Sequence, residues 1–503
     1  MSEIVNQTKH NRWLILFAGI CSHIPVVINM TTLHVAVPSL TKALDATGNE
    51  VLWIIDIYAL VMAGLLVPMG TLADKIGAKK VLLYGLVLFF VASLFAAMAP
   101  TAGLLILGRT LLAFAAAFIM PSILSIVRNT FDDEKERGIA LGLWGTVTAA
   151  GGAVGPLIGG ALLEHFWWGS VFLMNIPLLL MIIPFVYYVV PTFKANEKLT
   201  WEIKQALVLV VGLLSTIYSI KTIFKPESSK LVVLAVFIFG ISLLVWFVRK
   251  QLRSPRPMLD LNLFRLPAIT MGLLIALLVS GAFAGSELTI AQELQFVLQK
   301  SPLEAGLFML PLMLASAIGG PFAGYLVSYF GLRKVSTLSL LIAAGCFAGL
   351  GFSDFHDAGW LVIFYMAMMG LSLSIGLTSS SIAIMSSAPP EKAGAAGSIE
   401  GVGYELGMGL GITGFGLLLS MSYRNMLKVP NEIVEKISPQ AFYSISDTYV
   451  AAKNLSIAEA DELIKAGQVA FATSHGAVLL TAAVMVTIVA FAVFVILGKG
   501  KTK

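Results

Sequence analysis

The sequence predicts an all-α integral membrane protein with fourteen transmembrane helices, organised as two six-helix bundles and two inserted helices. Three observations support this prediction: an apolar composition, a series of long apolar runs, and a loop pattern that occurs twice. Of the 503 residues, 58% are hydrophobic and only 12% are charged, whereas a soluble domain carries about 25% charged residues. The lipid bilayer must therefore be most of the solvent for this chain.

The apolar runs are each long enough to cross a bilayer, which requires about 20 residues per helix. The formal net charge of +5 is modest and is typical of basic loops beside a membrane, not of a nucleic-acid-binding surface. Cys21 and Cys346 both lie in apolar runs and predict no disulfide framework. The predicted spans are 13–38, 51–71, 81–99, 103–127, 138–162, 168–190, 203–221, 231–250, 268–290, 303–328, 334–352, 359–385, 393–421 and 473–497.

The repeated loop pattern lies between two apolar runs in each half of the chain. It reads GTLADKIGAKK at 70–80 and GYLVSYFGLRK at 324–334, with glycine, glycine and a basic pair at the same spacing. Such a repeat predicts two related bundles, which is the architecture of alternating-access transporters. In the first copy the candidate conformational residues are Gly70, Asp74, Gly77 and Lys79. The second copy has Ser328 in place of Asp74.

A second pair of matching positions sets the domain organisation. Glu134-Lys135 and Glu391-Lys392 precede the fifth and thirteenth spans. Spans one to six therefore correspond to spans nine to fourteen, and spans seven and eight are an inserted pair. We expect a first bundle at 1–198, the inserted helices at 199–256, and a second bundle at 257–503 with a large extracellular loop at 421–472. Within that loop, Ser456 and Glu459 have capping-box spacing and predict a short helix to Ala472.

Basic residues set the predicted orientation. Loops that follow even-numbered spans are rich in lysine and arginine, so the positive-inside rule predicts that both termini are cytoplasmic. The exception is the loop at 221–230, whose three lysines are expected outside: Lys221, Lys225 and Lys230. The basic residues expected inside are Lys75, Lys79, Lys80, Arg128, Lys135, Arg137, Lys194, Lys198, Arg249, Lys250, Arg253, Arg256, Arg265, Arg333, Lys334 and Lys392.

Four motifs in order resemble the fourteen-span drug–proton antiporters of the major facilitator superfamily. They are the doubled loop, GGAVGPLIGG at 151–160, TTLHVAVP at 31–38 and WGSVFLMNIP at 168–177. Within that family, LWIIDIY at 52–58 and YELG at 404–407 are most similar to the quaternary-ammonium and methyl-viologen exporters of the QacA and SmvA type. The resemblance implies a major facilitator fold and a bacterial cytoplasmic (inner) membrane as its location.

The glycine-rich fifth span predicts close helix contact. Small residues let membrane helices approach one another, and Pro156 removes a backbone hydrogen bond and favours a kink. A hinge or seal and ordinary tight packing are the two alternatives for Gly151, Gly155, Pro156, Gly159 and Gly160. In the loop motif, Asp74 is expected to latch one conformation through a base or a helix N-terminus. The lysines beside it also act as a topology signal.

Ionisable residues inside membranes are costly and are functional candidates. Asp56 lies near the outer end of span two, and Trp53 lies one turn away on the same face. An acid beside an indole suits a lipophilic cation through charge and cation–π attraction. The alternative is an acid that reaches the outer interface. Tyr58, Trp144 and Tyr404 are the other aromatic candidates for substrate contact.

Span thirteen carries Glu400 and Glu405, which are five residues apart and so point about 140° from one another. We expect Glu405 to face a central cavity and Glu400 to face a neighbouring helix, although the reverse is almost equally favoured. Arg109 in span four matches the family's membrane-embedded arginine. The glycine that usually follows four positions later in the family is Ala113 here.

The first span departs from the family pattern, in which an aspartate normally begins the motif. Asn29 occupies that position and cannot carry a charge or take up a proton. Either the proton cycle runs on Asp56 and span thirteen alone, or a working acid has been altered, whether by natural divergence or by engineering. Glu287 and Glu293 are expected to be interfacial, and His34 is expected to be a hydrogen-bonding group.

These features predict a secondary transporter, not an enzyme. The resemblance implies proton-coupled multidrug efflux of lipophilic mono- and dicationic compounds, such as quaternary ammonium biocides, dyes and viologens. The expected partners are these cations, protons and membrane lipids. The protein is expected to be a monomer, and neither a cofactor nor a metal ion is expected. Transport of a specific physiological amine, peptide or lipid is the first alternative, and a membrane sensor or enzyme is a remote one.

Overall fold

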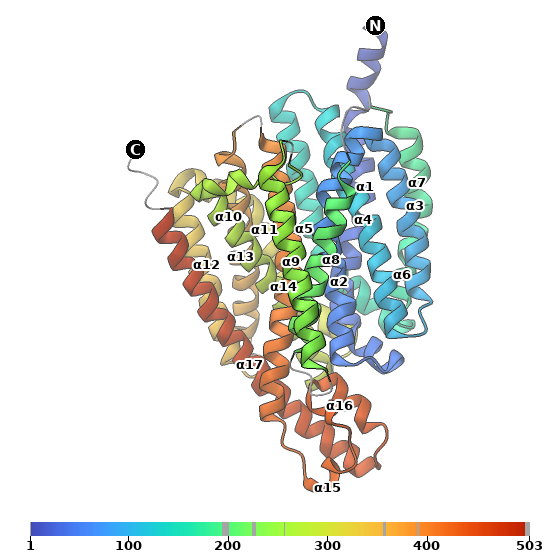
Figure 1. Ribbon diagram of the computed structural model, residues 1–503, viewed down its shortest axis with the longest axis vertical. Helices are drawn as coiled ribbons and strands as arrows, with labels where there is room; N and C mark the ends of the chain where they lie inside the picture. The colour runs from blue at the N-terminus through green and yellow to red at the C-terminus, as the bar shows by residue number, and fades with distance from the viewer. Residues whose placement is uncertain are drawn as a thin grey trace.

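A computed structural model shows a bundle of long helices that run side by side (Figure 1). It describes residues 2–193, 201–223, 228–255, 257–355, 359–389 and 392–497. Within these ranges there is no strand, and thirteen helices are long and apolar enough to cross a membrane. The predicted fifth span corresponds to α5 (Glu134–His165), which is not among the thirteen. An all-helical fold is confirmed, and the number fourteen stays a prediction.

The first half of the chain contains seven helical segments. The predicted sixth span is broken at Met174 into two of them, α6 and α7. The segments are α1 (Ser2–Leu44), α2 (Gly48–Ile76), α3 (Ala78–Ala97), α4 (Ala102–Thr130), α5 (Glu134–His165), α6 (Ser170–Leu173) and α7 (Asn175–Val189).

The second half contains the matching helices and a group of short segments after them. They are the 3-10 turn η1 (Leu261–Arg265), α10 (Pro267–Gln292), the π-helical η2 (Glu293–Val297), α11 (Pro302–Phe330), α12 (Leu332–Gly351), α13 (Trp360–Ser387), α14 (Ala393–Met426), α15 (Asn431–Val434), the 3-10 turn η4 (Pro439–Phe442), α16 (Ile445–Ala452) and α17 (Ile457–Ile496).

The packing of helices repeats between the halves. In the first half α1 packs on α5, α2 on α4, and α3 on α4 and α7. In the second half α10 packs on α14, α11 on α13, and α12 on α13 and α17. The doubled loop repeats as well, because Gly77 and Gly331 both have positive φ, 105° and 84°. Glycine suits these turns since other residues rarely adopt that region.

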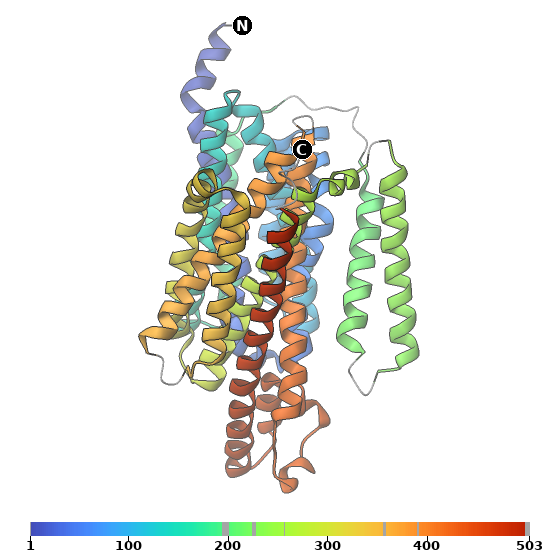
Figure 2. The ribbon, with the colours of Figure 1, turned by 90° about the vertical axis from the view of Figure 1, so that its left-hand side faces the viewer.

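Two further helices, α8 (Ile203–Thr222) and α9 (Lys230–Arg253), pack on each other and stand at one side of the bundle (Figure 2). Only α8 packs closely on the first half, along α2. The Trp201 indole donates to the carbonyl of Pro68 at 3.1 Å, and so fixes the start of the pair. The domain boundaries predicted at 198–199 and 256–257 fall on or beside positions that the structure does not describe. The residues of the sequence analysis that lie outside the described ranges are Lys194, Lys198, Lys225, Arg256 and Glu391.

The two ends of the bundle differ, and we name them by what they carry. The terminal end carries the start of α1 and the end of α17, and the cap end carries residues 427–456 with α15, η4 and α16 (Figure 1). The predicted capping box of Ser456 and Glu459 is confirmed. The helix that it begins is not separate, however, because α17 continues without a break from Ile457 to Ile496.

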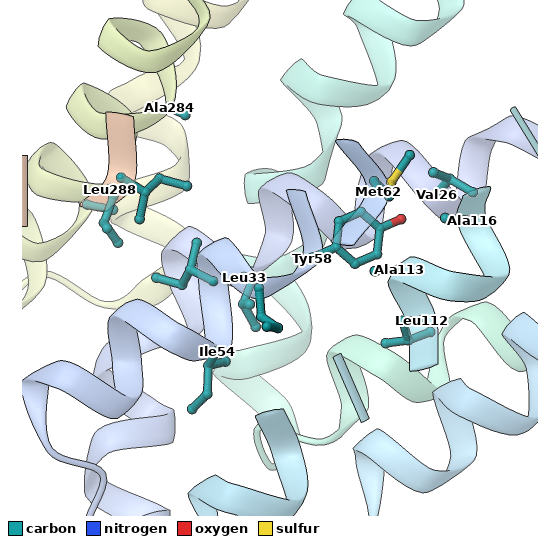
Figure 3. Close-up of a cluster of buried hydrophobic side chains, with 14 of the residues drawn as sticks. Val26, Leu33, Ile54, Tyr58, Met62, Leu112, Ala113, Ala116, Ala284 and Leu288 are labelled. Atoms are coloured by element: carbon teal, nitrogen blue, oxygen red, sulfur yellow. The ribbon is translucent and has the colours of Figure 1, made fainter. Parts of the chain in front are cut away.

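The core of the first half is apolar and closely packed. Val26, Tyr58, Met62 and Ala116 come together from α1, α2 and α4 (Figure 3). Ala113 belongs to the same cluster and is fully buried. The extra methyl group relative to glycine is therefore accommodated inside the bundle.

Candidate functional site

The halves of the protein meet along two pairs of helices, α2 with α14 and α5 with α11. Gly409, Thr413 and Gly416 of α14 all face α2. A methyl group on Gly409 would lie 2.6 Å from a Leu60 methyl carbon, and one on Gly416 would lie 2.5 Å from Leu52. These glycines let the two backbones approach closely. The antiparallel contact brings polar residues of both helices into one buried seam.

Asp56 lies in that seam and is fully buried. Its Oδ2 atom accepts hydrogen bonds from the Lys221 ammonium at 2.6 Å and from the Thr413 hydroxyl at 2.7 Å. Its Oδ1 atom has no hydrogen-bond partner among the residues that the structure describes. The three side chains come from α2, α8 and α14, so this carboxylate joins the first half, the added helix pair and the second half.

The Lys221 ammonium also lies over the indole of Trp53, 4.2 Å from the ring centroid. Sequence reasoning placed Lys221 in an external loop, and this prediction was wrong. The residue belongs to the last turn of α8, and its side chain is fully buried. A buried lysine requires a counter-charge, and Asp56 supplies it. Trp53 and Asp56 flank a cation that is a lysine of this chain, and their binding of a lipophilic cation stays a prediction.

Glu405 lies on the same face of α14 as Thr413, two helical turns closer to the terminal end. Eight residues of helix correspond to about 12 Å of rise. The Glu405 side chain is buried, and its Oε2 atom has no hydrogen-bond partner in the described part of the chain. Glu400 faces elsewhere, since it is hydrogen-bonded to Ser381 of α13. The structure thus places the two glutamates on different faces of the helix.

Arg109 reaches from α4 into the core of the first half and is 1% exposed. Its guanidinium donates to the side-chain oxygen of Asn29 and, at 3.0 Å, to the carbonyl of Ile54. It also lies 4.5 Å from the ring centroid of Tyr58. Arg109 therefore ties α1, α2 and α4 together through neutral partners, in a place where a carboxylate would be its usual partner.

The remaining aromatic candidates are half-buried. Trp144 of α5 lies beside the imidazole of His23, with ring centroids 5.1 Å apart. The backbone carbonyl of Tyr404 accepts a hydrogen bond from Ser280 of α10 at 3.1 Å. The faces of Trp53 and Tyr58 are occupied by cationic side chains of the protein itself.

Two histidine–glutamate contacts lie towards the cap end. His34 Nδ1 of α1 is 3.4 Å from Glu287 Oε2 of α10, and His475 Nδ1 of α17 is 3.5 Å from Glu293 Oε2. All four side chains are buried, so the expectation that both glutamates are interfacial was wrong. The first contact joins the two halves of the chain. Beside it, the Gln295 amide donates to the Val35 carbonyl at 3.0 Å.

The glycine-rich motif of α5 faces two neighbours. Methyl groups on Gly155 and Gly159 would lie 2.0 and 2.5 Å from side-chain atoms of Thr31 and Thr32 in α1. A methyl group on Gly160 would lie 2.6 Å from the Pro302 carbonyl oxygen of α11. Part of the motif therefore packs inside the first half, and its cap-end glycine packs on the second half. The same approach brings the Pro156 carbonyl towards Gly306.

At the terminal end, Asp74 pairs with a base, as expected. Its carboxylate accepts hydrogen bonds from Arg128 at 3.1 Å and from Ser125 at 2.8 Å, both on α4. Ser328, the equivalent residue of the second copy, donates to the Tyr325 carbonyl of its own helix. The first copy thus joins two helices, whereas this hydrogen bond of the second copy stays local. Lys79 lies 5.2 Å from the ring centroid of Tyr187.

At the cap end, residues 427–456 rest on the turn between α1 and α2. The Gly48 amide donates to Asp447 Oδ1 at 3.1 Å, and Lys453 donates to Asp45 Oδ1 at 2.6 Å. Together with the contacts of Gly160 and Gln295, these bonds close the cap end between the halves. This segment therefore bridges the halves, since it also packs on α17.

Sequence reasoning missed Lys221, Thr413, Glu287, Glu293 and His475 as members of buried polar pairs. One signal for Lys221 was available, since a lysine at the very end of an apolar run has a chain long enough to turn inwards. The histidine pairs had no such signal, because each joins residues that are far apart in the chain.

Comparison with known proteins gives a consistent result. The family model of the Major Facilitator Superfamily matches residues 19–412. The methyl viologen resistance protein SmvA of Salmonella typhimurium is 43% identical over 492 residues, which covers 98% of this chain and 99% of that protein. The multidrug efflux pump LfrA of Mycolicibacterium smegmatis is 33% identical over 485 residues, covering 95% of each chain.

Solved structures agree in fold. A bacterial homolog of the human lysosomal transporter Spinster, in an inward-facing and unoccupied conformation, matches with a TM-score of 0.67 and 16% identity. The match covers 97% of this chain and 98% of that one. At this identity the likeness concerns the arrangement of the helices alone.

Proposed function

The chain belongs to the Major Facilitator Superfamily, and from that premise we propose that it is a proton-coupled efflux antiporter for lipophilic mono- and dicationic compounds. Membership makes it a multi-pass membrane transporter and not an enzyme, as the sequence predicted. Methyl viologen is named in the resistance conferred by the 43% identical relative. Flat organic cations of this kind are the substrates that we propose.

The observation that carries the proposal is the buried acidic seam between α2 and α14. Asp56 binds an ammonium group beside an indole in the present structure. The same arrangement of negative charge and aromatic face suits a quaternary or pyridinium cation. Because the seam joins the two halves, a ligand held there contacts both bundles and is able to influence their relative position.

We assign the coupled proton to Glu405. This carboxyl is buried, has an unpartnered oxygen and lies about two turns, or about 12 Å, from Thr413 along the seam. A carboxyl in such surroundings is stable when it is neutral, and a cation that enters the seam favours its ionised form. The positive charge of a cation at Asp56 and the proton on Glu405 then disfavour each other within the seam, and this opposition couples the two fluxes. Glu400 is hydrogen-bonded to Ser381, and we assign it the smaller role in proton coupling.

The proposed cycle uses the contacts at both ends. The cap end is closed in this structure, and we propose that it faces the outside of a bacterial cytoplasmic membrane with both termini inside. Lys75, Lys79, Lys80 and Arg128 then lie on the cytoplasmic side, as the positive-inside rule requires. Release of the cation outwards requires the contacts of Gly160, Gln295 and residues 427–456 to separate.

The direct test is movement of methyl viologen, or of a cationic dye, in inverted vesicles under an imposed pH gradient. The proposal predicts gradient-dependent accumulation that is abolished by Asp56→Asn and by dissipating the gradient. Accumulation that survives without a proton gradient, or transport of neutral compounds only, would overturn it. Asp133→Asn, the same change at the exposed N-cap of α5, where asparagine also caps a helix, serves as the matched control.

A further inference from the structure

The helix pair α8–α9 is not needed to complete either half, since each half has its own set of packed helices. It stands beside the bundle in Figure 2 and touches the first half mainly through α8 and α2. Its single buried ion pair to the bundle, among the pairs described for this part of the chain, is Lys221 with Asp56. The contact of Lys221 with Asp56 is therefore the place where helices α8 and α9 are able to influence the function of the bundle.

Asp56 and Trp53 form a cation-binding site, and the Lys221 ammonium occupies it. The Lys221 ammonium meets a carboxylate oxygen at 2.6 Å and an indole face at 4.2 Å. Thr413 of the second half donates to the same oxygen at 2.7 Å, while the other oxygen has no hydrogen-bond partner. Carboxylate, indole and an open acceptor position are the features that recognise an organic cation.

We propose that Lys221 is a tethered counter-ion that shares Asp56 with the transported cation and leaves the carboxylate when that cation binds. The inference rests on the proposed function and extends it: the added helix pair carries a competitor for the substrate site. Substrates would then be restricted to compounds whose positive charge outcompetes a primary ammonium at a carboxylate and whose flat surface covers Trp53.

The position of Lys221 in its helix permits this exchange. It is the second-last residue of α8, and Ile223, two positions later, is exposed. A lysine near a helix end reaches the membrane interface with its four-carbon chain. The ammonium is thus able to move between Asp56 and the cap-end interface while α8 stays in place.

The exchange also solves a problem of charge. A lone carboxylate in the apolar seam is costly, and Asp56 without a partner would have to take up a proton. With Lys221 present between substrates, and the substrate present otherwise, the carboxylate keeps a cationic partner at each stage. Proton transfer is then left to Glu405, which has no cationic partner among its described contacts.

The test is equilibrium binding of the cationic dye ethidium to the purified full chain in detergent. Lys221→Met removes the competitor, so the dissociation constant is expected to fall by about ten-fold or more, because the dye no longer displaces a paired charge. Lys230→Met is the matched control, since it removes an exposed lysine from the other helix of the same pair. Its dissociation constant should equal that of the unaltered chain.

A second comparison separates competition at Asp56 from general repulsion. In an Asp56→Asn background, adding Lys221→Met should leave the dissociation constant unchanged, since there is no shared carboxylate. The inference is overturned if Lys221→Met alone leaves binding within about two-fold of the unaltered chain or weakens it. It is also overturned if the gain persists in the Asp56→Asn background.

If the Lys221→Met variant does not accumulate in the membrane, Lys221→Arg tests whether Lys221 competes with the cation for Asp56. A guanidinium forms two hydrogen bonds with a carboxylate and is displaced less readily, so ethidium binding should weaken, and unchanged binding would overturn the inference. The proposed function fails in a different way. If the unaltered chain binds no ethidium and moves no cation, the function is wrong. If the unaltered chain transports cations normally and the Lys221 variants do not change the dissociation constant of ethidium, the proposal that Lys221 is a tethered counter-ion is wrong.

Discussion

The guanidinium of Arg109 on α4 donates to the side-chain oxygen of Asn29 on α1, and both side chains are buried. The arginine therefore faces a neutral amide at the position where the sequence resemblance implies an acid. A buried arginine interacts more strongly with a carboxylate than with an amide. Arg109 and the residue at position 29 are thus placed as the partners of an ion pair would be, but Asn29 does not carry the negative charge.

Asn29→Asp should consequently increase pH-gradient-driven dye transport, because it adds a titratable group already in contact with Arg109. The measurement is the initial rate of dye accumulation in inverted vesicles at matched expression. Asn425→Asp, the same change on the exposed last turn of α14, should have no effect. An unchanged rate in Asn29→Asp would show that the first span takes no part in proton coupling here.

Gly160 seals the cap end of the α5–α11 contact. Replacing it with valine places atoms where the Pro302 carbonyl oxygen would be 2.6 Å away, and overpacking of this kind costs about 1–3 kcal/mol. We expect faster hydrogen–deuterium exchange in residues 427–456, which rest on the closed halves. Gly103→Val, where nothing lies within 4 Å, is the control. Equal exchange in both variants would show that α5 does not seal this end.

The contact of His34 with Glu287 joins α1 to α10 across the halves. Glu287→Gln removes the carboxyl group that this histidine faces, so the cap end should open more often. Modification of His34 by diethyl pyrocarbonate, followed by mass spectrometry, should then increase. Glu304→Gln retains the capping box of α11 and should leave His34 as protected as before. Protection of His34 in both variants would mean that the contact does not hold the halves together.

Asp74 joins α2 to α4 through Arg128 and Ser125, whereas the hydrogen bond described for Ser328 stays within its own helix. Asp74→Asn should therefore slow dye efflux markedly, and Ser328→Ala should barely change it. Because Arg128 and Asp74 are partly exposed, the loss of stability should be small, about 0–1 kcal/mol. A fall in melting temperature large enough to explain the lost transport would contradict a conformational role.

Asp260 and Lys392 form an ion pair of 2.7 Å that joins the turn after α9 to the start of α14. The hydrogen bond from Lys392 lowers the pKa of the Asp260 carboxyl. A lowered folded-state pKa stabilises the protein above the ordinary aspartate value of about 3.9, and this stability is lost as the pH falls through the folded value. Lys392→Ala should thus lower the melting temperature at pH 7, and the difference should shrink below about pH 4. A difference independent of pH would exclude this pair as its cause.

Much of the fold was predictable, because its determinants are local. The apolar runs define the helices, and the positive φ of Gly77 and Gly331 follows from a loop pattern that is readable in the sequence. The capping box at Ser456 was predictable for the same reason. The continuation of that helix into α17 was not, since the polar first turns of a helix look like a separate segment.

The candidate site was predictable only in part. Asp56, Arg109 and Glu405 stand out because charges inside apolar runs are costly. Their partners do not, because each partner comes from a distant part of the chain: Lys221 lies 165 residues from Asp56, and Thr413 lies 357 residues from it. Sequence spacing describes neighbours on one helix, whereas these pairs depend on how helices pack.

The central claim is that a cation bound at Asp56 in the α2–α14 seam favours release of the proton carried by Glu405. The most direct measurement is proton release from the purified protein in weakly buffered detergent solution when methyl viologen is added. The account predicts release by the unaltered chain and by Glu400→Gln, and none by Glu405→Gln. Release by Glu405→Gln equal to that of the unaltered chain would contradict it.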